Sequence, residues 1–383
     1  MDASEDFEID WEKRFDGLKE DWEVIERVLP EGWQEAARHT GALRRTRGFK
    51  DAASLLRAML IHLVDGCSLR ETAVRVRAGG LADVSDVALL LRLRGCGQWF
   101  RWMGEQMSRR LSRANTHEVF AGKPVRLVDA SVVCEPGATG STWRIHYMID
   151  LSTLACEQLQ VTLPECGETL TRFSVSPGEI LMADRGLANR RGIRHVVDHG
   201  GDVIVRANLV SVPLQDERGQ AMALLPKLRE LKVGEVGRWQ AFMRDEHGTV
   251  ALEVCALKKS AEQTRKAQRK LLESASKKQH KVQPATLEAA GYVVVLTTLK
   301  QVCARQILEL YRHRWQIELA FKRLKSLLEL GHLKKSDQEG AKAWLQGKLF
   351  VATLIETLLA VGELFSPWGY FLSAEQKAPL SVA

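Results

Sequence analysis

Residues Tyr311–Lys325 read YRHRWQIELAFKRLK. The stretch contains no Pro or Gly and consists mostly of good helix formers, so we predict one continuous α-helix. Successive residues of a helix are about 100° apart, which gives this helix two different faces. One face is an apolar stripe that a core can bury, formed by Leu310, Ile317, Phe321, Leu324 and Leu328. The other is a polar strip with one acid among cations, formed by Tyr311, Arg314, Glu318, Lys322 and Lys325.

This polar strip suits an anionic ligand, with a metal ion between the ligand and Glu318. The alternative is a solvated helix face with ion pairs four residues apart, such as Glu318 with Lys322. Periodicity alone leaves both interpretations open.

Composition sets limits on the class of protein. The 383-residue chain is 45% hydrophobic, which supports a sizeable core and allows one large or two to three ordinary domains. The formal net charge is +7, although the first 24 residues hold ten acids and only three bases. The basic remainder indicates a polyanionic partner, most readily nucleic acid.

Cysteine usage and hydropathy bear on the compartment. Seven scattered cysteines without a C-x-x-C pair argue against a disulfide framework and against a cysteine zinc site, and favour a reducing cytoplasm. The acidic N-terminus lacks the apolar segment of a signal peptide. The apolar segment Leu349–Phe365 contains two Glu residues, so we expect a buried helix and no membrane span.

Residues 1–120 are expected to be helical. Ser68 and Glu71 form a capping box, which predicts a helix that breaks at residues 78–80. A second helix is predicted from about Ser85 to Gly95. The two have the outline of a helix-turn-helix, in which Arg92 and Arg94 would meet DNA; an ordinary helical hairpin fits equally well.

After Pro124 the pattern changes to strands. Alternating or continuous apolar runs predict strands at Val125–Val133, Thr142–Leu154, Cys156–Leu163, Ile180–Ala183 and Val203–Arg206. A helix is predicted at about Asn189–His199, between the last two. Three strands followed by strand, helix and strand predict an α/β fold with a mixed sheet and helices packed on it.

Residues 209–290 interrupt this pattern. They contain two alternating segments, Gly237–Met243 and Val250–Leu257, and then a basic tract, Lys258–Lys281, whose middle favours a helix. The tract either reaches outward to phosphates or is a solvated surface helix. Tyr292–Leu299 is then predicted as a buried strand, and Ala341–Phe365 as the last helical unit.

Two acids stand in unusual contexts. Asp129 lies in the middle of the first apolar strand, where an unpaired charge is costly, and Asp184 follows the end of the fourth. If these strands are neighbours, the two carboxylates lie side by side, which is unfavourable unless a cation joins them. Glu318, on a helix over the sheet, would complete an all-oxygen site. Such ligands indicate Mg²⁺ or Mn²⁺ and argue against zinc.

These residues carry a resemblance to a known family. The spacing of Tyr311, Arg314, Glu318 and Lys325 matches the YREK signature of the insertion-sequence-four (IS4) family of DDE transposases. The surrounding strings VDAS at Asp129, ADRG at Asp184 and VVVLTTL in the late strand are similar too, and the likeness covers residues 68–365.

The resemblance implies a ribonuclease-H-like core. It further implies a β-rich insertion and a helical DNA-binding domain in front of the core. The boundaries that follow are 1–120 for the DNA-binding domain, 121–208 and 291–340 for the two parts of the core, 209–290 for the insertion with its basic helix, and 341–383 for a C-terminal helical region.

The resemblance also implies site residues and chemistry. Asp129, Asp184 and Glu318 would be the catalytic acids and would hold two Mg²⁺ or Mn²⁺ ions. Water would first release a 3′-hydroxyl at each element end, and that hydroxyl would then attack target DNA. The residues expected to hold phosphates near the cut are Tyr311, Arg314, Lys325 and, as a weaker addition, Lys322.

The expected partners are double-stranded DNA and a second copy of the chain, since two element ends must be brought together. We expect a bacterial cytoplasmic protein associated with the nucleoid. Trp315 is expected in the core, with stacking on a base as the alternative. Two other functions stay open: a transposase-derived DNA-binding protein without catalysis, and a related metal-dependent nuclease that cuts without joining.

Overall fold

The computed structural model describes residues 21–44, 46, 48–114, 120, 122–134, 142–277, 279, 281–327 and 337–364. The chain divides into two units. One contains residues 1–114, 134–139 and 324–383, and the other contains residues 115–133 and 140–323. Each unit is described below by itself.

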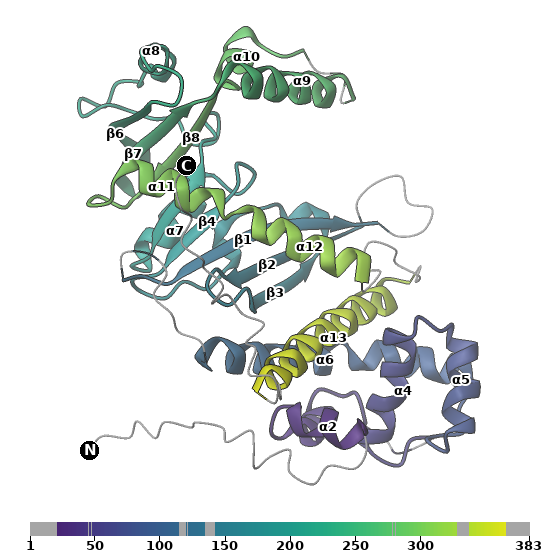
Figure 1. The fold of residues 1–383 in the computed structure, drawn as a ribbon. Helices are drawn as coiled ribbons and strands as arrows, with labels where there is room; N and C mark the ends of the chain where they lie inside the picture. The colour runs from purple at the N-terminus through teal and green to yellow at the C-terminus, as the bar shows by residue number, and fades with distance from the viewer. Residues whose placement is uncertain are drawn as a thin grey trace, which may run out of the picture. The chain divides into compact units, whose positions relative to one another are not determined.

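The second unit is built on a sheet. The described residues form eight strands in the order β3-β2-β1-β4-β5-β8-β7-β6 (Figure 1). Strand β4 pairs in parallel with β1 and β5, and the remaining pairs are antiparallel. The strands are β1 (Val125–Val133), β2 (Trp143–Asp150), β3 (Cys156–Thr162), β4 (Ile180–Ala183), β5 (Asp202–Arg206), β6 (Val236–Asp245), β7 (Gly248–Lys258) and β8 (Tyr292–Thr297).

The predicted mixed sheet flanked by helices is confirmed, and it has the form of a ribonuclease-H-like core. The helices of this unit are α7 (Arg190–Asp198), α8 (Leu224–Arg229), α9 (Ala261–Lys277), α10 (Pro284–Ala289), α11 (Ala304–Arg312) and α12 (Trp315–Leu327), with the 3₁₀ turns η1 (Pro164–Cys166) and η2 (Leu170–Arg172). The two strands of the segment expected to interrupt the core, β6 and β7, extend the same sheet beyond β8. Figure 1 shows α12 crossing in front of β1, β2 and β3.

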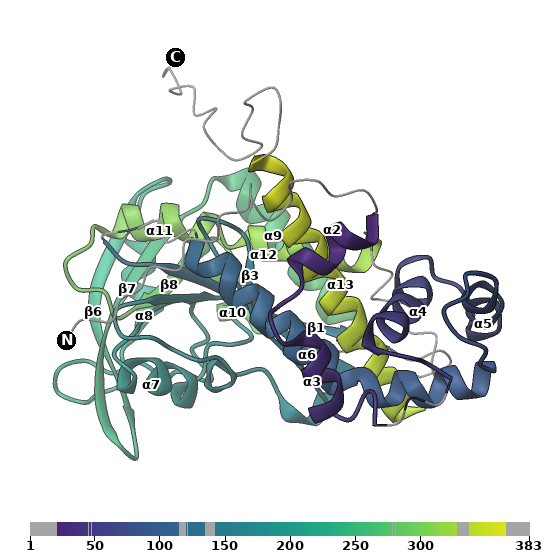
Figure 2. The ribbon, with the colours of Figure 1, turned by 90° about the horizontal axis from the view of Figure 1, so that it is seen from below.

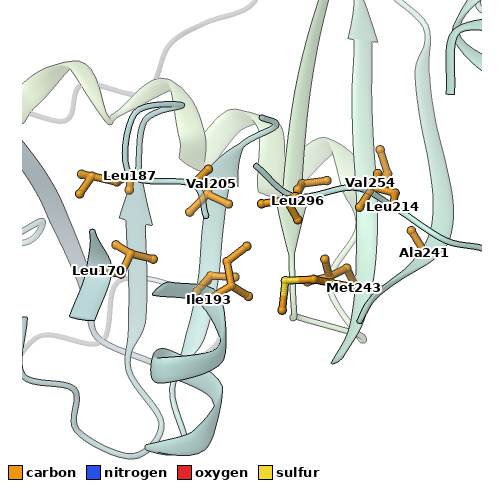
Figure 3. Close-up of a cluster of buried hydrophobic side chains, with 14 of the residues drawn as sticks. Leu170, Leu187, Ile193, Val205, Leu214, Ala241, Met243, Val254 and Leu296 are labelled. Atoms are coloured by element: carbon orange, nitrogen blue, oxygen red, sulfur yellow. The ribbon is translucent and has the colours of Figure 1, made fainter. Parts of the chain in front are cut away.

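One hydrophobic core cluster of this unit lies on one face of the sheet. Side chains alternate between the two faces of a strand, so Val128, Ala183 and Val205 share one face. They belong to a cluster that also contains Ile193 of α7 and Met243 of β6. Figure 3 shows the cluster running from Leu170 and Leu187 across to Val254 and Ala241. The neighbouring positions Asp129, Asp184 and Arg206 therefore point to the opposite face.

The first unit is helical. Its described helices are α2 (Asp21–Val28), α3 (Trp33–His39), α4 (Ala52–Val64), α5 (Leu69–Ala78), α6 (Asp86–Ala114) and α13 (Gln338–Leu364). Helix α13 runs beside α6 in Figures 1 and 2, with the rings of Phe100 and Phe350 stacked 5.8 Å apart. Ser68 caps α5 as predicted, since its side chain accepts a hydrogen bond from the amide of Glu71.

The helix predicted to end at Gly95 continues to Ala114, because glycines let it pack closely: a Cβ on Gly97 would lie 3.3 Å from the Cα of Ala343. Among the described helices, one segment, Gln338–Ala360, is long and apolar enough to cross a membrane, but 67% of its apolar window is buried inside the protein. It is the buried helix that the sequence predicted.

Candidate active site

Asp129 and Asp184 are brought together by strand register. Strand β1 pairs in parallel with β4, and Val128 is the register partner of Ala183. Each aspartate directly follows one of these two residues, so both lie on the same row and on the same face of adjacent strands. The neighbouring strand places Arg206 on this row as well, because Ala183 pairs with Val205.

The electrostatics of Asp129 agree with this register. Burial raises the pKa of Asp129 to about 7, and the charges of Asp184 and Glu168 act in the same direction. The hydrogen bond from the amide of Ala130 and the charge of Arg314 oppose the rise. Asp184, Glu168 and Arg314 therefore all act on the charge of Asp129.

The helix that carries the signature is broken. The continuous helix predicted for Tyr311–Lys325 is wrong: α11 ends at Arg312 and α12 begins at Trp315. The amides of His313 and Arg314 donate to the carbonyls of Leu310 and Tyr311, three residues back, which closes a tight turn. Side chains on both sides of this turn are buried, Tyr311 before it and Ile317 after it.

Apolar residues of the predicted stripe are buried both before and after this break. Leu310 and Ile317 are buried, and the ring of Phe321 lies 5.5 Å from that of Tyr147. Tyr147 is the register partner of Asp129, so α12 packs on the same face as the acids. Leu328 and the side chain of Leu324 lie outside the described part of the structure.

Tyr311 does not lie on an open polar strip. It is 8% exposed, and its hydroxyl has no hydrogen-bond partner among the described residues. Burial raises the pKa of Tyr311 to about 12; Arg314 and Arg206 oppose the rise and Asp184 adds to it. The hydroxyl is thus a buried polar group with Arg314, Arg206 and Asp184 as its charged neighbours.

Arg314 connects Glu318 to the aspartates. It forms an ion pair with Glu318 across one turn, while its guanidinium lies 6.0 Å from the centre of the Tyr311 ring. Although burial acts against it, the charges of Tyr311, Glu318 and Asp184 raise the pKa of Arg314. Arg314 therefore interacts electrostatically both with Glu318 and with Asp184.

Glu318 itself is largely exposed and paired with Arg314. Its side chain is 57% exposed and is bound by Arg314. In the described part of the chain, no group of three or more Asp, Glu, His or Cys side chains is placed to hold a metal ion. The structure thus brings Asp129 and Asp184 together but does not bring Glu318 into contact with them.

The two lysines of the signature helix lie along α12. Lys322 is exposed, and Lys325 is half-buried in the last turn. Trp315, expected in the core, is 48% exposed, because it opens α12 directly after the turn. The expectation of a buried Trp315 is therefore wrong.

The structure adds two residues that sequence reasoning missed. Arg206 ends β5 on the row of the aspartates, and its charge acts on Tyr311. Glu168, between η1 and η2, acts on Asp129, as noted above. The only sequence signal for Arg206 was its place after an apolar strand, and Glu168 stands in a polar loop without a signal.

Other cations expected at DNA differ in their surroundings. Arg94 is engaged inside the helical unit, where its Nε lies 2.9 Å from Oδ1 of Asp337. The basic tract forms α9 as predicted, and no residue of this helix is buried. Lys266, Arg269 and Lys270 are exposed on it.

The fold and the paired aspartates define a ribonuclease-H-like protein of the DDE class. Residues 155–354 match the family model described as the transposase DDE domain, a range that includes Asp184 and Glu318. The chain therefore belongs to the DDE transposases, within the IS4 family of insertion sequences.

Several transposases are similar to this chain, two of them over most of its length. InsL of insertion sequence element IS186A from Escherichia coli (strain K12) is 36% identical over 346 residues, covering 88% of this chain and 93% of the relative. The transposase for insertion sequence element IS421 from Escherichia coli is 35% identical over 347 residues, with the same coverage. The transposase for element IS231F from Bacillus thuringiensis subsp. israelensis is 28% identical over 134 residues, 34% of this chain.

Proposed function

We propose that this transposase binds the terminal inverted repeats of its insertion sequence, cleaves DNA at the element ends and joins the resulting 3′-hydroxyls to target DNA. The observation that carries the proposal is the register of β1 and β4, which makes Asp129 and Asp184 neighbours on one face. Two adjacent carboxylates, one of them with a strongly raised pKa, are the arrangement that a divalent cation relieves.

The residues present fit a hard divalent cation. The donor set is carboxylate oxygen, and strand register places Asp129 and Asp184 side by side. We propose that Asp129, Asp184 and Glu318 hold two Mg²⁺ or Mn²⁺ ions. Bound there, such ions lower the pKa of an attacking hydroxyl and offset the charge of a leaving oxygen.

Arg314 would control the third acid. In the structure it is bound to Glu318, and a DNA phosphate is a competing anion for the same guanidinium. In our proposal, DNA binding draws Arg314 to the phosphate and frees Glu318 to turn toward Asp129 and Asp184. Substrate would thus complete the site that cleaves it.

The remaining cations would hold the DNA backbone. We assign phosphate contacts to Tyr311, Arg314, Lys322 and Lys325, and add Arg206, which stands on the row of the aspartates. Phosphate contacts position the strand without reading its sequence. Sequence recognition at the ends is assigned to the front helical domain, residues 1–120.

The wider assignments follow the same proposal. Residues 121–208 and 291–340 form the two parts of the catalytic core, 209–290 the insertion that offers α9 to DNA, and 341–383 the C-terminal helical region. The protein would act as a homodimer that holds two element ends, in the cytoplasm at the nucleoid.

A joining assay tests the proposal. Duplexes that carry the element's terminal repeats, already cut to expose 3′-hydroxyls, are supplied with Mg²⁺ and a supercoiled target plasmid. We expect insertion of the ends into the plasmid, and no insertion without a divalent cation. If uncut ends are cleaved but pre-cut ends are never joined, the protein is a nuclease; if ends are bound but neither cut nor joined, it is a DNA-binding protein without catalysis.

A further inference from the structure

Lys259 extends the face of the sheet that carries the paired aspartates. It directly follows β7, and its amide donates a hydrogen bond of 2.9 Å to the carbonyl of Gly291, which continues the ladder between β7 and β8. The row of Arg206 passes through Val295 of β8 to Cys255 of β7. Because side chains alternate along a strand and Lys259 lies an even number of residues after Cys255, it shares the face of Arg206.

The neighbouring Lys258 lies on the opposite face. It is the register partner of Tyr292, a member of the core cluster, and its Nζ lies 5.8 Å from the centre of that ring. The same Nζ donates a hydrogen bond of 2.7 Å to the carbonyl of Leu231. These two consecutive lysines are both half-buried, and of the two it is Lys259 that shares the face of the acids.

Lys259 is fixed in place, but no acid offsets its charge. Its Nζ donates a hydrogen bond of 2.7 Å to the carbonyl of Ala290, at the C-terminal end of α10. Burial lowers the pKa of Lys259, and the charge of Arg206 acts in the same direction. In the described part of the chain, neither Lys259 nor Arg206 forms an ion pair with an acid. The ammonium group has three N–H donors, of which Ala290 takes one, so this cation can still bind an anion.

Lys259 also joins this face of the sheet to the basic helix. Ser260, the next residue, caps α9, which begins at Ala261. Helix α9 lies beside α10 in Figure 1, and none of its residues is buried. Its exposed cations include Lys266 in the second turn. Cations therefore continue from Arg206, on the row of the acids, through Lys259 to α9.

We propose that Lys259 contacts a phosphate of the end DNA and connects the phosphate contacts of the catalytic face with those of α9. The inference rests on the proposed function and adds a residue that positions the substrate. A phosphate beside Lys259 offsets the repulsion between Lys259 and Arg206, because an anion near two cations attracts both. A lysine meets a phosphate as a point charge, so this contact holds the DNA backbone without reading its sequence.

Binding of end duplexes over a range of salt concentrations tests the proposal. We expect K259Q to lower the slope of log affinity against log salt by about 0.9, the contribution of one phosphate contact in duplex DNA. At 0.1 M salt this change corresponds to a complex that is about eightfold weaker. The matched control is K258Q, which removes the same charge from the neighbouring position on the opposite face and should keep the wild-type slope.

Two further measurements separate a phosphate contact from a structural role at Ala290. K259R keeps the positive charge and should keep the wild-type slope, whereas K259Q keeps a donor for the carbonyl of Ala290 and loses the charge. In cleavage assays, K259Q should raise the DNA concentration for half-maximal rate and leave the maximal rate unchanged, because the acids are intact. A wild-type salt slope in K259Q would overturn the inference, as would equal losses of slope in K259Q and K258Q.

Failure of this inference can be told apart from failure of the proposed function. If the wild-type protein joins pre-cut ends and K259Q keeps the wild-type slope, Lys259 is not a DNA contact and the proposed function stands. If the wild-type protein neither cuts nor joins ends but K259Q still lowers the slope, the proposed function is wrong and the phosphate contact at Lys259 remains.

Discussion

A carboxylate in the middle of a buried strand is costly unless another group uses it, and Asp129 is such a residue. Its pKa of about 7 reflects burial first and the neighbouring acids second. In our proposal, a divalent cation bound there would offset this charge. In our proposal, DNA cleavage depends on the carboxylate oxygens of Asp129, Asp184 and Glu318.

Substitution of the three acids should abolish DNA cleavage and leave DNA binding largely intact. We expect D129N, D184N and E318Q each to reduce cleavage of end DNA at least about a hundredfold, because each removes a ligand oxygen. Binding of the ends in a gel-shift assay should change little, since phosphates and bases are held by other groups. Cleavage near the wild-type rate in any one variant would remove that residue from the site.

His146 should make stability depend on pH. Burial lowers the pKa of His146 to about 4, and Arg172 and Arg144 act in the same direction. The unfolded chain takes up this proton at about pH 6.5, whereas the folded protein does so only near 4, so stability is full above pH 6.5 and is lost as the pH falls toward 4. The slope from this group is at most about 1.4 kcal/mol per pH unit.

Urea denaturation from pH 7.5 to 4.5 measures this effect. The stability of H146Q should fall less steeply than that of the wild type, because the variant has no imidazole to protonate. H247Q, which alters an exposed turn residue, should keep the wild-type slope. Equal slopes for wild type and H146Q would show that His146 does not titrate in this way.

The site residues differ in how far the sequence could predict them. Asp129 and Asp184 were predictable because a charge inside or directly after an apolar strand is conspicuous. Glu168 was not, because it stands in the polar string PECGETL and only the fold brings it to Asp184. The approach of Glu318 to the aspartates stays a prediction, since the structure holds this residue at Arg314.

At the scale of elements, the break between α11 and α12 is the main difference from the sequence prediction. Nothing in YRHRWQIELAFKRLK opposes a helix, because it contains neither Pro nor Gly. Tertiary packing decides instead: Tyr311 is buried on one side of the turn, and Phe321 contacts Tyr147 on the other. Helix propensity depends on local sequence, so it does not predict the effect of burying Tyr311 and Phe321 on two sides of the turn.

The length of α6 has a similar cause. Gly95 reads as a helix end, but α6 continues past it, and Gly97 lets α6 approach α13 closely. In contrast, strand ends at β1, β4 and β5 agreed with prediction to within one residue, since apolar runs bounded by polar residues give a strong signal.

Two glycines of α6 provide a matched test of this packing. A Cβ on Gly97 would lie 3.3 Å from the Cα of Ala343, whereas on Gly104 the nearest atom would be 3.9 Å away. We expect G97A to destabilise the protein by about 1–3 kcal/mol, because the backbone of α13 must move. G104A should be neutral or stabilising by up to about 1 kcal/mol, since Ala is the better helix former.

The denaturant midpoints of G97A and G104A test this prediction about helix packing. A destabilisation of G104A as large as that of G97A would mean that helix packing at these positions is not what the glycines serve. A stabilised G97A would contradict the close approach of α6 and α13.

At the scale of the whole molecule, the net positive charge and the DDE transposase fold both indicate a DNA partner. The sheet order confirms the mixed α/β core, and the segment expected as an insertion adds β6 and β7 to that same sheet before it forms α9. The sequence could not show this pairing, because it depends on contacts between β7 and β8 across more than thirty residues of chain.

Helix α9 should contribute non-specific affinity. Lys266 and Lys270 are exposed one turn apart, so the double variant K266Q/K270Q should weaken end binding and lower the slope of log affinity against log salt by about two. E273Q, which removes an acid from the same helix, should not weaken binding. An unchanged salt slope in the double variant would show that α9 does not contact phosphates.

The most direct test of the account is to map where a divalent ion sits in the protein bound to its element ends. Fe²⁺ in place of Mg²⁺, with ascorbate and peroxide, cuts the polypeptide next to the bound ion, and mass spectrometry locates the cuts. We predict cuts beside Asp129, Asp184 and Glu318, all suppressed by excess Mg²⁺. Cuts confined to other segments, with β1 and the end of β4 intact, would contradict it.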